Sequence, residues 1–290
     1  MRRILACVLT GVLLMTAAAA GAATQTLPLD LSPGMPLKKA NYLSEWHYSD
    51  PTVEMKAREE RIGDVTYWVA EVEIGSPTQL RTMPAYSFSS SSTAEGKKLS
   101  RRANAVLSCN GDYWWRDVKW KGNYVLRQGQ LYMYNLTGHS DVLLIDEDGD
   151  FHIIPKATEE NTPVKTTPTG RILYQGKQVY NGFCFGPALV TEGKALTIEP
   201  DDYMITEKKA ARMALCQMGR LKYAVVCCYR ERMTLQEFAD LLEALGAQTA
   251  YNLDGGASTM MFTRDRMINQ NPSTREIGDI IYFASAWSNE

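Results

Sequence analysis

Histidine is scarce in this sequence, and basic residues are not in excess. Three histidines in 290 residues leave little material for a metal centre built from imidazole ligands. The 31 Lys and Arg residues are balanced by 33 Asp and Glu, whereas a protein that binds a phosphate backbone needs a clear excess of positive charge. Composition therefore argues against a nucleic-acid partner and against a histidine-rich metal site.

The standard catalytic and nucleotide-binding motifs are absent as well. The chain contains no G-x-S-x-G elbow, no P-loop, no G-x-G-x-x-G and no H-E-x-x-H. A Ser-His-Asp triad would have to use His47, His139 or His152, and nothing in the sequence supplies partners for any of them. Carboxylates and glycine-rich loops are therefore the remaining candidates for a functional site.

Long apolar runs are confined to the start of the chain. A basic start, Met1–Arg3, precedes the apolar run Ile4–Met15, and small residues follow as far as Ala23. This order is typical of a secretory signal peptide over residues 1–23, since about a dozen apolar residues fall short of the roughly 20 that a spanning helix needs. We expect cleavage near Ala23, a secreted product in an extracellular or periplasmic location, and no stable membrane insertion afterwards.

Removal of this leader leaves an odd number of cysteines. An exported protein can form disulfides, but one of the remaining five thiols would have to stay free or pair between chains. No C-x-x-C occurs, and the adjacent pair at 227 and 228 lies in an apolar run, where buried strand thiols are expected. No pairing can be predicted for the mature cysteines, which are Cys109, Cys184, Cys216, Cys227 and Cys228.

Strand patterns dominate the mature chain. Residues 24–40 contain three prolines and are expected to form an N-terminal arm, followed by one domain over residues 41–290. The run Thr66–Ile74 is rich in β-branched and aromatic residues, as strands are. Strands and helices do not alternate regularly, as they would in a parallel α/β fold. We predict a single α+β domain with a mixed or antiparallel sheet and a few packed helices.

Two segments have the pattern of helices. Residues 94–103 form the first, with Ser92 and Glu95 at the spacing of a capping box. Residues 235–245 form the clearer one, because leucine and phenylalanine make one apolar stripe between a Thr-x-x-Glu capping box and a terminal glycine.

The most distinctive stretch, Asn252 to Thr259, reads N-L-D-G-G-A-S-T and follows a predicted strand at 249–253. The strand would deliver the Asp254 carboxylate to its end, and the glycines would let the backbone approach a ligand closely. Consecutive N–H groups, with the Ser258 and Thr259 hydroxyls, could cradle phosphate or sugar oxygens. A plain turn after a strand has a similar composition, so this stretch alone leaves the function open.

Two further candidates also lie at the ends of apolar strands. Asn110, Gly111 and Asp112 close one strand, and Arg212 opens another. An arginine can bind an anionic group with two parallel hydrogen bonds. Taken singly, each candidate also fits a turn former or a surface charge.

The order of these motifs resembles the phosphodiester glycosidase family. Asn-Gly-Asp-Tyr follows a strand, F-G-P-A-L-V occupies 185–190, Arg212 heads a strand and Asn-Leu-Asp-Gly-Gly-x-Ser-Thr comes near the end. The resemblance covers about residues 94–283 and includes a late arginine, Arg275. Ala257 departs from it, because the family usually has a third glycine there. Alanine is strained where φ is positive, so we expect a slightly reshaped loop.

The resemblance implies hydrolysis of the bond between a sugar's anomeric carbon and a phosphodiester. The substrate would be a small sugar phosphodiester or an envelope or extracellular polysaccharide, with N-acetylglucosamine as one candidate sugar and no cofactor. Phosphate leaves easily, so the site has mainly to bind an anion and stabilise positive charge at the anomeric carbon. The expected catalytic residues are Asp254, Asp112 and Arg212, and the expected substrate-binding residues are Asn110, Gly111, Asn252, Gly255, Gly256, Ser258, Thr259 and Arg275.

Two other functions fit the same residues. One is an envelope protein that binds anionic glycans without catalysis, and the other is a phosphodiesterase that cuts the P–O bond on the side away from the sugar. Asp254, Asp112 and Asn110 offer the hard oxygen ligands that calcium or magnesium prefers. They lie far apart in the sequence, however, and no ligand spacing supports a metal site. We therefore predict an enzyme without a metal.

Overall fold

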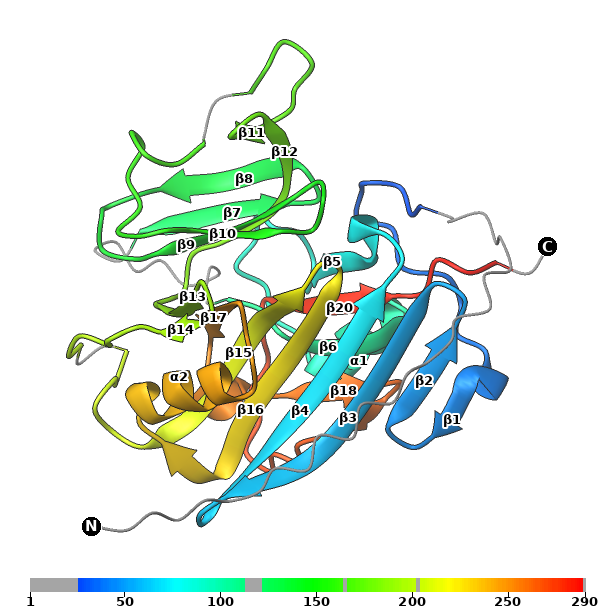
Figure 1. Cartoon of the computed structure of the whole chain (residues 1–290). Helices are drawn as coiled ribbons and strands as arrows, with labels where there is room; N and C mark the ends of the chain where they lie inside the picture. The colour runs from blue at the N-terminus through cyan, green and yellow to red at the C-terminus, as the bar shows by residue number, and fades with distance from the viewer. Residues whose placement is uncertain (1–25, 113–121, 164–165, 202–203, 289–290) are drawn as a thin grey trace.

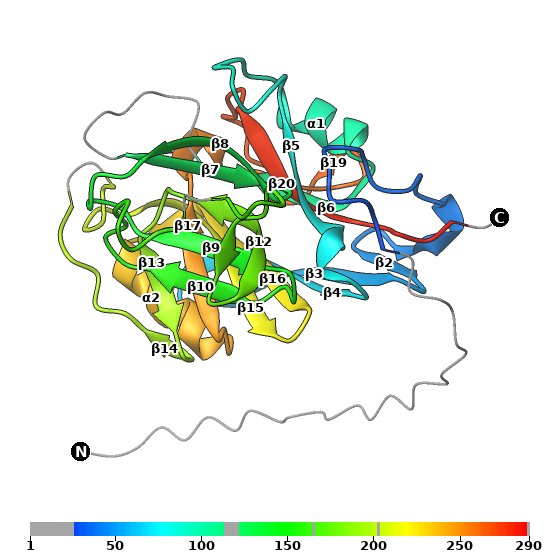
Figure 2. The same ribbon diagram turned by 90° about the horizontal axis from the view of Figure 1, so that it is seen from above.

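Three antiparallel sheets make up most of the protein (Figure 1). The computed structural model describes residues 26–112, 122–163, 166–201 and 204–288, so the predicted leader lies outside the described residues. Every pairing between described strands is antiparallel. In Figure 1 the five-stranded sheet lies behind the nine-stranded sheet and the six-stranded sheet lies above both, and Figure 2 looks down on the six-stranded sheet from above.

The order of the strands across each sheet differs from their order along the chain. The nine-stranded sheet runs from β1 (Tyr42–Ser44) through β2 (His47–Asp50), β3 (Val53–Ile62), β4 (Val65–Ile74), β16 (Lys222–Met233), β15 (Ala210–Gly219), β17 (Thr249–Leu253) and β13 (Ala188–Thr191) to β14 (Lys194–Ala195). The six-stranded sheet runs from β10 (Phe151–Ile154) through β9 (Val142–Asp146), β12 (Lys177–Phe183) and β7 (Asn123–Arg127) to β8 (Gln130–Asn135), and β11 (Leu173–Tyr174) pairs with β12. The five-stranded sheet runs from β19 (Arg266–Met267) through β18 (Met261–Thr263), β6 (Ala105–Asn110) and β20 (Asp279–Ala284) to β5 (Leu80–Pro84).

The fold class predicted from the sequence is wrong. Strands account for 46% of the structure and helices for 10%, so the domain is mostly β rather than α+β. The described residues contain two α-helices, α1 (Gly96–Arg102) and α2 (Leu235–Ala244), and three short 3-10 turns, η1 (Lys39–Asn41), η2 (Pro77–Gln79) and η3 (Gly256–Ser258). Among these residues, neither helix has the length and apolar character needed to cross a bilayer.

The main core lies between sheets, which explains why the helices do not form a layer of their own. Met213 of β15, Leu107 of β6 and Leu143 of β9 belong to one buried apolar cluster, to which all three sheets contribute. Phe238 of α2 packs on the opposite face of the nine-stranded sheet, and Leu99 of α1 packs on the five-stranded sheet. Each helix therefore covers the outer face of one sheet, because alternate side chains of a strand point to opposite faces.

Helix α2 begins where the sequence predicts and ends one residue before the predicted end, with Leu245 as its C-cap. The Thr234 hydroxyl accepts a hydrogen bond from the Glu237 N–H at 3.2 Å, and the Glu237 carboxylate accepts one from the Thr234 N–H at 2.8 Å. Gly246 follows the helix with a φ of +86°, a conformation that favours glycine. The predicted capping box and terminal glycine are confirmed.

Helix α1 begins later than predicted, and its predicted capping box is wrong. Glu95 precedes the first helical residue and its side chain makes no capping hydrogen bond. The backbone of Ala94 exchanges hydrogen bonds with Ile277 at 3.0 and 2.9 Å, so the chain is still extended there. This pairing with a distant residue prevents Ser92 from reaching the helix terminus.

The described part of the N-terminal arm, residues 26–40, is tied to the five-stranded sheet. Arg81 of β5 is 1% exposed and donates to the carbonyls of Pro28, Asp30 and Ser32 at 2.9, 2.8 and 3.0 Å. Burying a guanidinium requires that its donors find partners, and the arm supplies them.

All five described cysteines are free and buried. Burial raises the pKa of the Cys109 and Cys216 thiols and raises that of Cys227 well above its usual value. The expectation of buried thiols at Cys227 and Cys228 is confirmed, since both lie in β16. Because none of the five described cysteines forms a disulfide, their odd number does not require a pairing between chains.

Candidate active site

The glycine-rich loop follows β17 and turns through η3. A Cβ atom at Gly255 would lie 2.5 Å from the carbonyl oxygen of Ala211, so the close approach of β15 requires glycine. Gly256 has a φ of +59°, which favours glycine for a conformational reason. Ala257 does not have a positive φ and is the middle residue of η3. The strain expected at this alanine is therefore absent.

A guanidinium and a carboxylate meet over this loop. Arg275 Nη2 donates to Asp254 Oδ2 at 2.5 Å, and Arg275 Nε donates to Ser258 Oγ at 2.6 Å. The Arg275 N–H also donates to the Ala257 carbonyl at 3.1 Å. The Asp254 side chain is 11% exposed, whereas the Arg275 side chain is 34% exposed. The loop therefore presents a charge pair that is partly shielded from water, a setting in which electrostatic interactions strengthen.

Asn110 anchors this loop from the end of β6. Its Nδ2 donates to the Asp254 carbonyl at 2.6 Å, and its Oδ1 accepts from the Met260 N–H at 3.2 Å. Asn110 is fully buried, and its amide binds the backbone at both ends of the loop, at Asp254 and at Met260. A Cβ atom at Gly111 would lie 2.3 Å from an Asp279 carboxylate oxygen, which explains the glycine next to it.

Asn252 connects the loop to a neighbouring segment. Its Nδ2 donates to the Gly186 carbonyl at 2.8 Å, and its N–H donates to the Pro187 carbonyl at 3.2 Å. Phe185, next to these residues, thereby comes to lie beside the glycine-rich loop, and both line the same cavity.

Two asparagines that the sequence patterns did not single out fix the far end of the loop. Asn269 Nδ2 and Asn271 Nδ2 donate to the Thr259 carbonyl at 2.9 and 3.0 Å. Asn269 Oδ1 also accepts from the Met261 N–H at 3.0 Å. The N-Q-N run in a polar segment was the only signal for them, and it does not indicate which backbone groups they would bind.

Arg212 is surrounded by backbone carbonyls. Its Nη2 donates to Ile205 and Lys208 at 2.7 and 2.9 Å, its Nη1 donates to Met204 at 3.3 Å and its Nε donates to Met233 at 3.2 Å. Arg212 is 5% exposed, and burial lowers the pKa of its guanidinium. It holds the segment that forms one wall of the cavity, and it also lines that cavity.

Asp112 lies in a buried cluster of charges. Its Oδ1 accepts from Arg127 Nη2 at 2.8 Å, and its Oδ2 accepts from the Cys184 N–H at 3.1 Å. The same Nη2 lies 3.5 Å from Asp279 Oδ2, and the Arg127 guanidinium carbon lies 4.1 Å from the centre of the Phe183 ring. The three charged side chains are fully buried, and none of them lines the cavity at the glycine-rich loop. Sequence reasoning did not identify Arg127 or Asp279.

The cavity at the loop has a volume of about 340 Å³. The structure brings six of the predicted site residues into its lining, and it places the other five behind or beside the loop. The lining consists of Phe185, Met204, Ile205, Ala210, Ala211, Arg212, Asn252, Leu253, Asp254, Gly255, Gly256, Ala257 and Arg275. The five predicted residues outside the lining are Asn110, Gly111, Asp112, Ser258 and Thr259.

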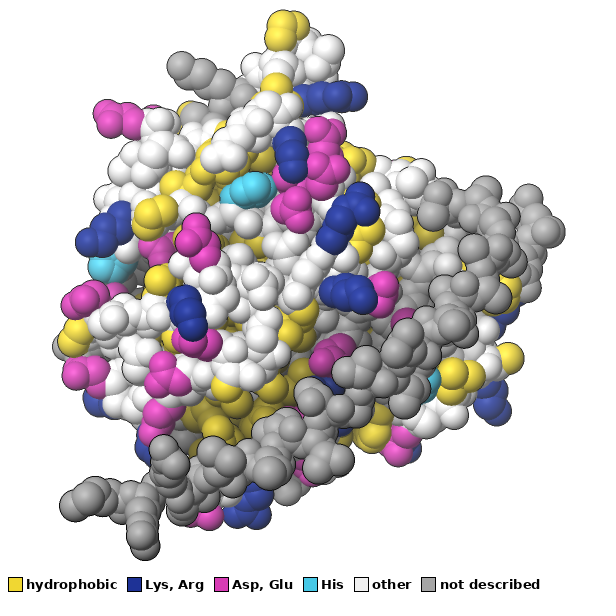
Figure 3. Space-filling model, in the orientation of Figure 1, with side chains coloured by type: hydrophobic (Ala, Val, Ile, Leu, Met, Phe, Trp, Pro, Cys, Tyr) yellow, Lys and Arg dark blue, Asp and Glu magenta, His cyan; other side chains and the backbone are white. Residues whose placement is uncertain are grey.

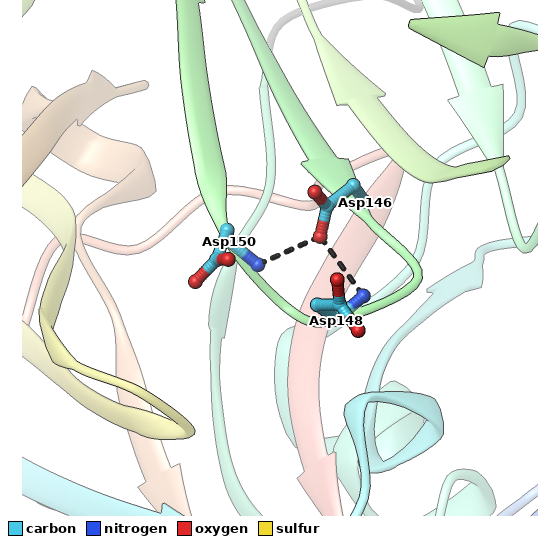
Figure 4. A group of neighbouring side chains, drawn as sticks. All are labelled: Asp146, Asp148 and Asp150. Atoms are coloured by element: carbon cyan, nitrogen blue, oxygen red, sulfur yellow. Dashed lines mark hydrogen bonds between the residues drawn. The ribbon is translucent and has the colours of Figure 1, made fainter. Parts of the chain in front are cut away.

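One group of carboxylates in the described part of the chain is close enough to share a metal ion (Figure 4). Asp146, Asp148 and Asp150 lie in the hairpin between β9 and β10, and Asp146 Oδ1 accepts from the other two N–H groups at 2.9 and 3.0 Å. Lys177 Nζ lies 3.3 Å from Asp146 and 2.8 Å from Asp148, and His152 Nε2 lies 2.9 Å from Asp146. The lysine ammonium thus offsets part of the group's negative charge within the fold, and Asp254 is not a member of the group.

The chain matches a protein family over the region that contains the site. The model of a family described as phosphodiester glycosidase matches residues 103–284, which is more than half of the chain. The chain belongs to the phosphodiester glycosidase family. The resemblance predicted from the sequence is therefore confirmed, and every predicted site residue falls within the matched range. The search of curated proteins found no match to this chain.

Two solved structures share its fold. The first is the catalytic domain of the zebrafish N-acetylglucosamine-1-phosphodiester alpha-N-acetylglucosaminidase, auto-inhibited by its pro-peptide. It matches at a TM-score of 0.62 and 16% identity over 81% of this chain and 84% of that one. The second is a hypothetical protein from Synechocystis, with a TM-score of 0.52 and 16% identity over 80% of this chain and 62% of that one. At such low identity these likenesses show a common fold and no more.

Proposed function

We propose that this protein hydrolyses the bond between the anomeric carbon of a sugar and the oxygen of a phosphodiester. Water adds across that bond, so that the hydroxyl goes to the sugar carbon and the proton goes to the phosphate oxygen. The products are a free sugar and a phosphomonoester. Family membership supports a hydrolase of phosphodiester glycosides, and the site's charges support this particular bond.

The observation that carries the proposal is the pair formed by Arg275 and Asp254 in a glycine loop that lines a cavity. Arg275 is the partly exposed cation at the site, so we assign it to the phosphate, together with the backbone of Gly256 and Ala257. Asp254 would face the anomeric carbon, where it either stabilises the developing positive charge or activates the attacking water. Ser258 would set the angle of the guanidinium.

Arg212 and Asp112 receive positioning roles in this proposal. The guanidinium of Arg212 donates its hydrogen bonds to backbone carbonyls, which suits a residue that shapes the cavity wall. Asp112 is neutralised by Arg127 and lies outside the lining, which suits a residue that fixes the end of β6. Asn110 and Thr259 would hold the loop, and Asn252 would hold the wall beside it.

We further propose that the substrate belongs to the cell envelope or the extracellular space. The order of basic, apolar and small residues over 1–23 supports export. The face shown in Figure 3 intersperses acidic and basic side chains, which supports a small anionic group as the target rather than a nucleic acid. The name of the zebrafish neighbour makes an N-acetylglucosamine phosphodiester the first substrate to test.

Identification of the products tests the proposal. A synthetic N-acetylglucosamine phosphodiester should yield free sugar and a phosphomonoester. Sugar 1-phosphate would instead indicate a phosphodiesterase that cuts the other P–O bond. Binding without any product would indicate a glycan-binding protein, and either result would overturn the proposal.

A further inference from the structure

The guanidinium that the proposed function assigns to the phosphate already has an anionic partner within the chain. Arg275 Nη2 donates to Asp254 Oδ2 at 2.5 Å, and Arg275 Nε donates to Ser258 Oγ at 2.6 Å. A phosphodiester is an anion at neutral pH, as the carboxylate is, and both accept charge-assisted hydrogen bonds from a guanidinium. The Asp254 carboxylate therefore occupies donors that the phosphate would use.

Among the described residues that line the cavity, Arg275 and Arg212 are the two basic ones, and Asp254 is the acidic one. The Arg212 guanidinium donates to the backbone carbonyls of four residues and is 5% exposed, so its donors are committed to the fold. Two like charges beside a single guanidinium repel each other, the more so where water is partly excluded. The phosphate and Asp254 therefore compete for Arg275.

Opening of this ion pair has to be a rotation of side chains, because the backbone on both sides is fixed. The Asp254 carbonyl accepts from Asn110 Nδ2 at 2.6 Å, and the Arg275 N–H donates to the Ala257 carbonyl at 3.1 Å. The glycine after Asp254 lies against β15, where a Cβ atom would come within 2.5 Å of the Ala211 carbonyl oxygen. A change of partner at the guanidinium therefore leaves the loop in place.

We propose that the Asp254 carboxylate competes with the substrate phosphate for Arg275, and that this competition makes the site selective for phosphodiesters. The phosphate of a bound substrate takes over the guanidinium, and the displaced carboxylate then acts at the anomeric carbon. An uncharged glycoside brings no anion that can displace the carboxylate, so the charge of Asp254 stays partly neutralised by Arg275. This inference rests on the proposed function and specifies how its catalytic carboxylate is controlled.

Binding of inorganic phosphate tests the competition without assuming which sugar is released. Calorimetry at one fixed pH compares the wild-type protein with Asp254→Asn, which keeps the shape of the side chain and removes its charge. Asp254→Asn should bind phosphate at least about tenfold more tightly than the wild type, because the anion no longer has to displace a carboxylate. A carboxylate that only supports the site would give the opposite result, weaker binding by the variant.

Two further variants separate competition for Arg275 from a general effect of charge. In an Arg275→Gln background the contested donors are gone, so Asp254→Asn should tighten phosphate binding by no more than about twofold. Glu199→Gln removes one charge from an exposed acid outside the lining of this cavity, and it should change the affinity by less than about twofold. Asp254→Ala, which also removes the charge, gives the same comparison if the asparagine variant does not fold.

Two N-acetylglucosamine compounds test the selectivity. The 4-nitrophenyl glycoside has a good leaving group but no charge, and the methyl phosphodiester has both. Since a positioned carboxylate contributes about 100-fold or more to the rate, the wild-type enzyme should cleave the 4-nitrophenyl glycoside at least about 100-fold more slowly. Comparable rates would show that Asp254 acts without displacement by a phosphate, and they would overturn the inference.

Equal or weaker phosphate binding by Asp254→Asn, or a gain that persists in the Arg275→Gln background, would overturn the competition. Failure of Asp254→Asn to bind phosphate would overturn it as well. The proposed function fails separately, through the lack of sugar release from phosphodiesters, and tighter phosphate binding by Asp254→Asn would survive that result.

Discussion

Asp254 makes more contacts than a residue that only forms a turn would require. Its carbonyl is held by Asn110, its carboxylate is bonded to Arg275, and the glycine after it lies against β15. An arginine paired with a carboxylate is common on surfaces, but in this site the carboxylate side chain is 11% exposed and lines a cavity. Charged groups that are paired or have perturbed pKa values and that line a cavity are candidates for catalytic groups.

Replacing Asp254 by asparagine should abolish most of the activity and leave the fold intact. Asparagine keeps the shape and a carbonyl oxygen that can accept from Arg275, but it loses the charge that faces the anomeric carbon. A positioned carboxylate contributes about 100-fold or more to the rate, so kcat/KM should fall by at least that factor. Asp64→Asn, at a fully exposed acid, is the control. Wild-type turnover in Asp254→Asn would remove this residue from the mechanism.

The two neighbouring positions of the loop should respond to substitution for different reasons. Gly256→Ala forces a Cβ into a positive φ and should cost about 1 kcal/mol in the free energy of unfolding. Ala257→Gly restores the third glycine typical of the family and relieves no strain. It should therefore lower stability by roughly 0.5 kcal/mol through the greater freedom of the unfolded chain. Urea unfolding of both variants measures the difference, and a stabilised Ala257→Gly would show that the alanine is strained.

The elements divide into those that local sequence specifies and those that depend on distant pairing. Helix α2 follows its apolar stripe and its cap, and the β15–β16 hairpin follows two apolar runs around a glycine turn. Helix α1 starts late because Ala94 pairs with Ile277, more than 180 residues away. No local pattern reveals such a partner.

The candidate site shows the same division. The loop at 254–259 could be predicted because strand, carboxylate and glycines lie next to one another in the sequence. The burial of Asp112 against Arg127 and Asp279 could not be predicted, because the three residues lie at the ends of three different strands. Asp112 follows β6, Arg127 ends β7 and Asp279 begins β20. The carbonyl partners of Arg212 likewise come from a segment whose path is set by tertiary packing.

The cap of α2 gives a test at the scale of an element. Thr234→Ala removes the hydroxyl that accepts from Glu237 and should lower the free energy of unfolding by about 1 kcal/mol. Activity should not change, because α2 covers the outer face of the nine-stranded sheet. Thermal unfolding and turnover measured on one preparation check both statements. Thr234→Ser should restore the stability, and an unchanged melting temperature in the alanine variant would contradict the capping role.

At the scale of the whole molecule, the hairpin acids contribute a pH-dependent part of the stability. Burial by itself raises the pKa of Asp146, but hydrogen bonds from His152, from the N–H groups of Asp150 and Asp148, and from Lys177 together lower it from 3.8 to about 2. The folded state therefore favours the ionised carboxyl. Its stabilisation is present above about pH 4 and is lost as the pH falls through about 2.

Asp146→Asn should accordingly destabilise the protein by on the order of 2 kcal/mol at pH 7 and by much less near pH 2. Urea unfolding of wild type and variant at several pH values measures this difference. Asp64→Asn, at an exposed acid, should show little effect at any pH. A destabilisation that does not depend on pH would mean that packing, and not ionisation, accounts for the role of Asp146.

The central claim concerns which bond breaks, and hydrolysis in water labelled with heavy oxygen tests it most directly. Cleavage at the anomeric carbon places the label in the released sugar and none in the phosphomonoester. Mass spectrometry of the phosphomonoester is the measurement, because its oxygens do not exchange with water on the time scale of the assay. We predict an unlabelled phosphomonoester. One labelled oxygen in the phosphorus-containing product would mean that water attacks phosphorus, and it would contradict the account.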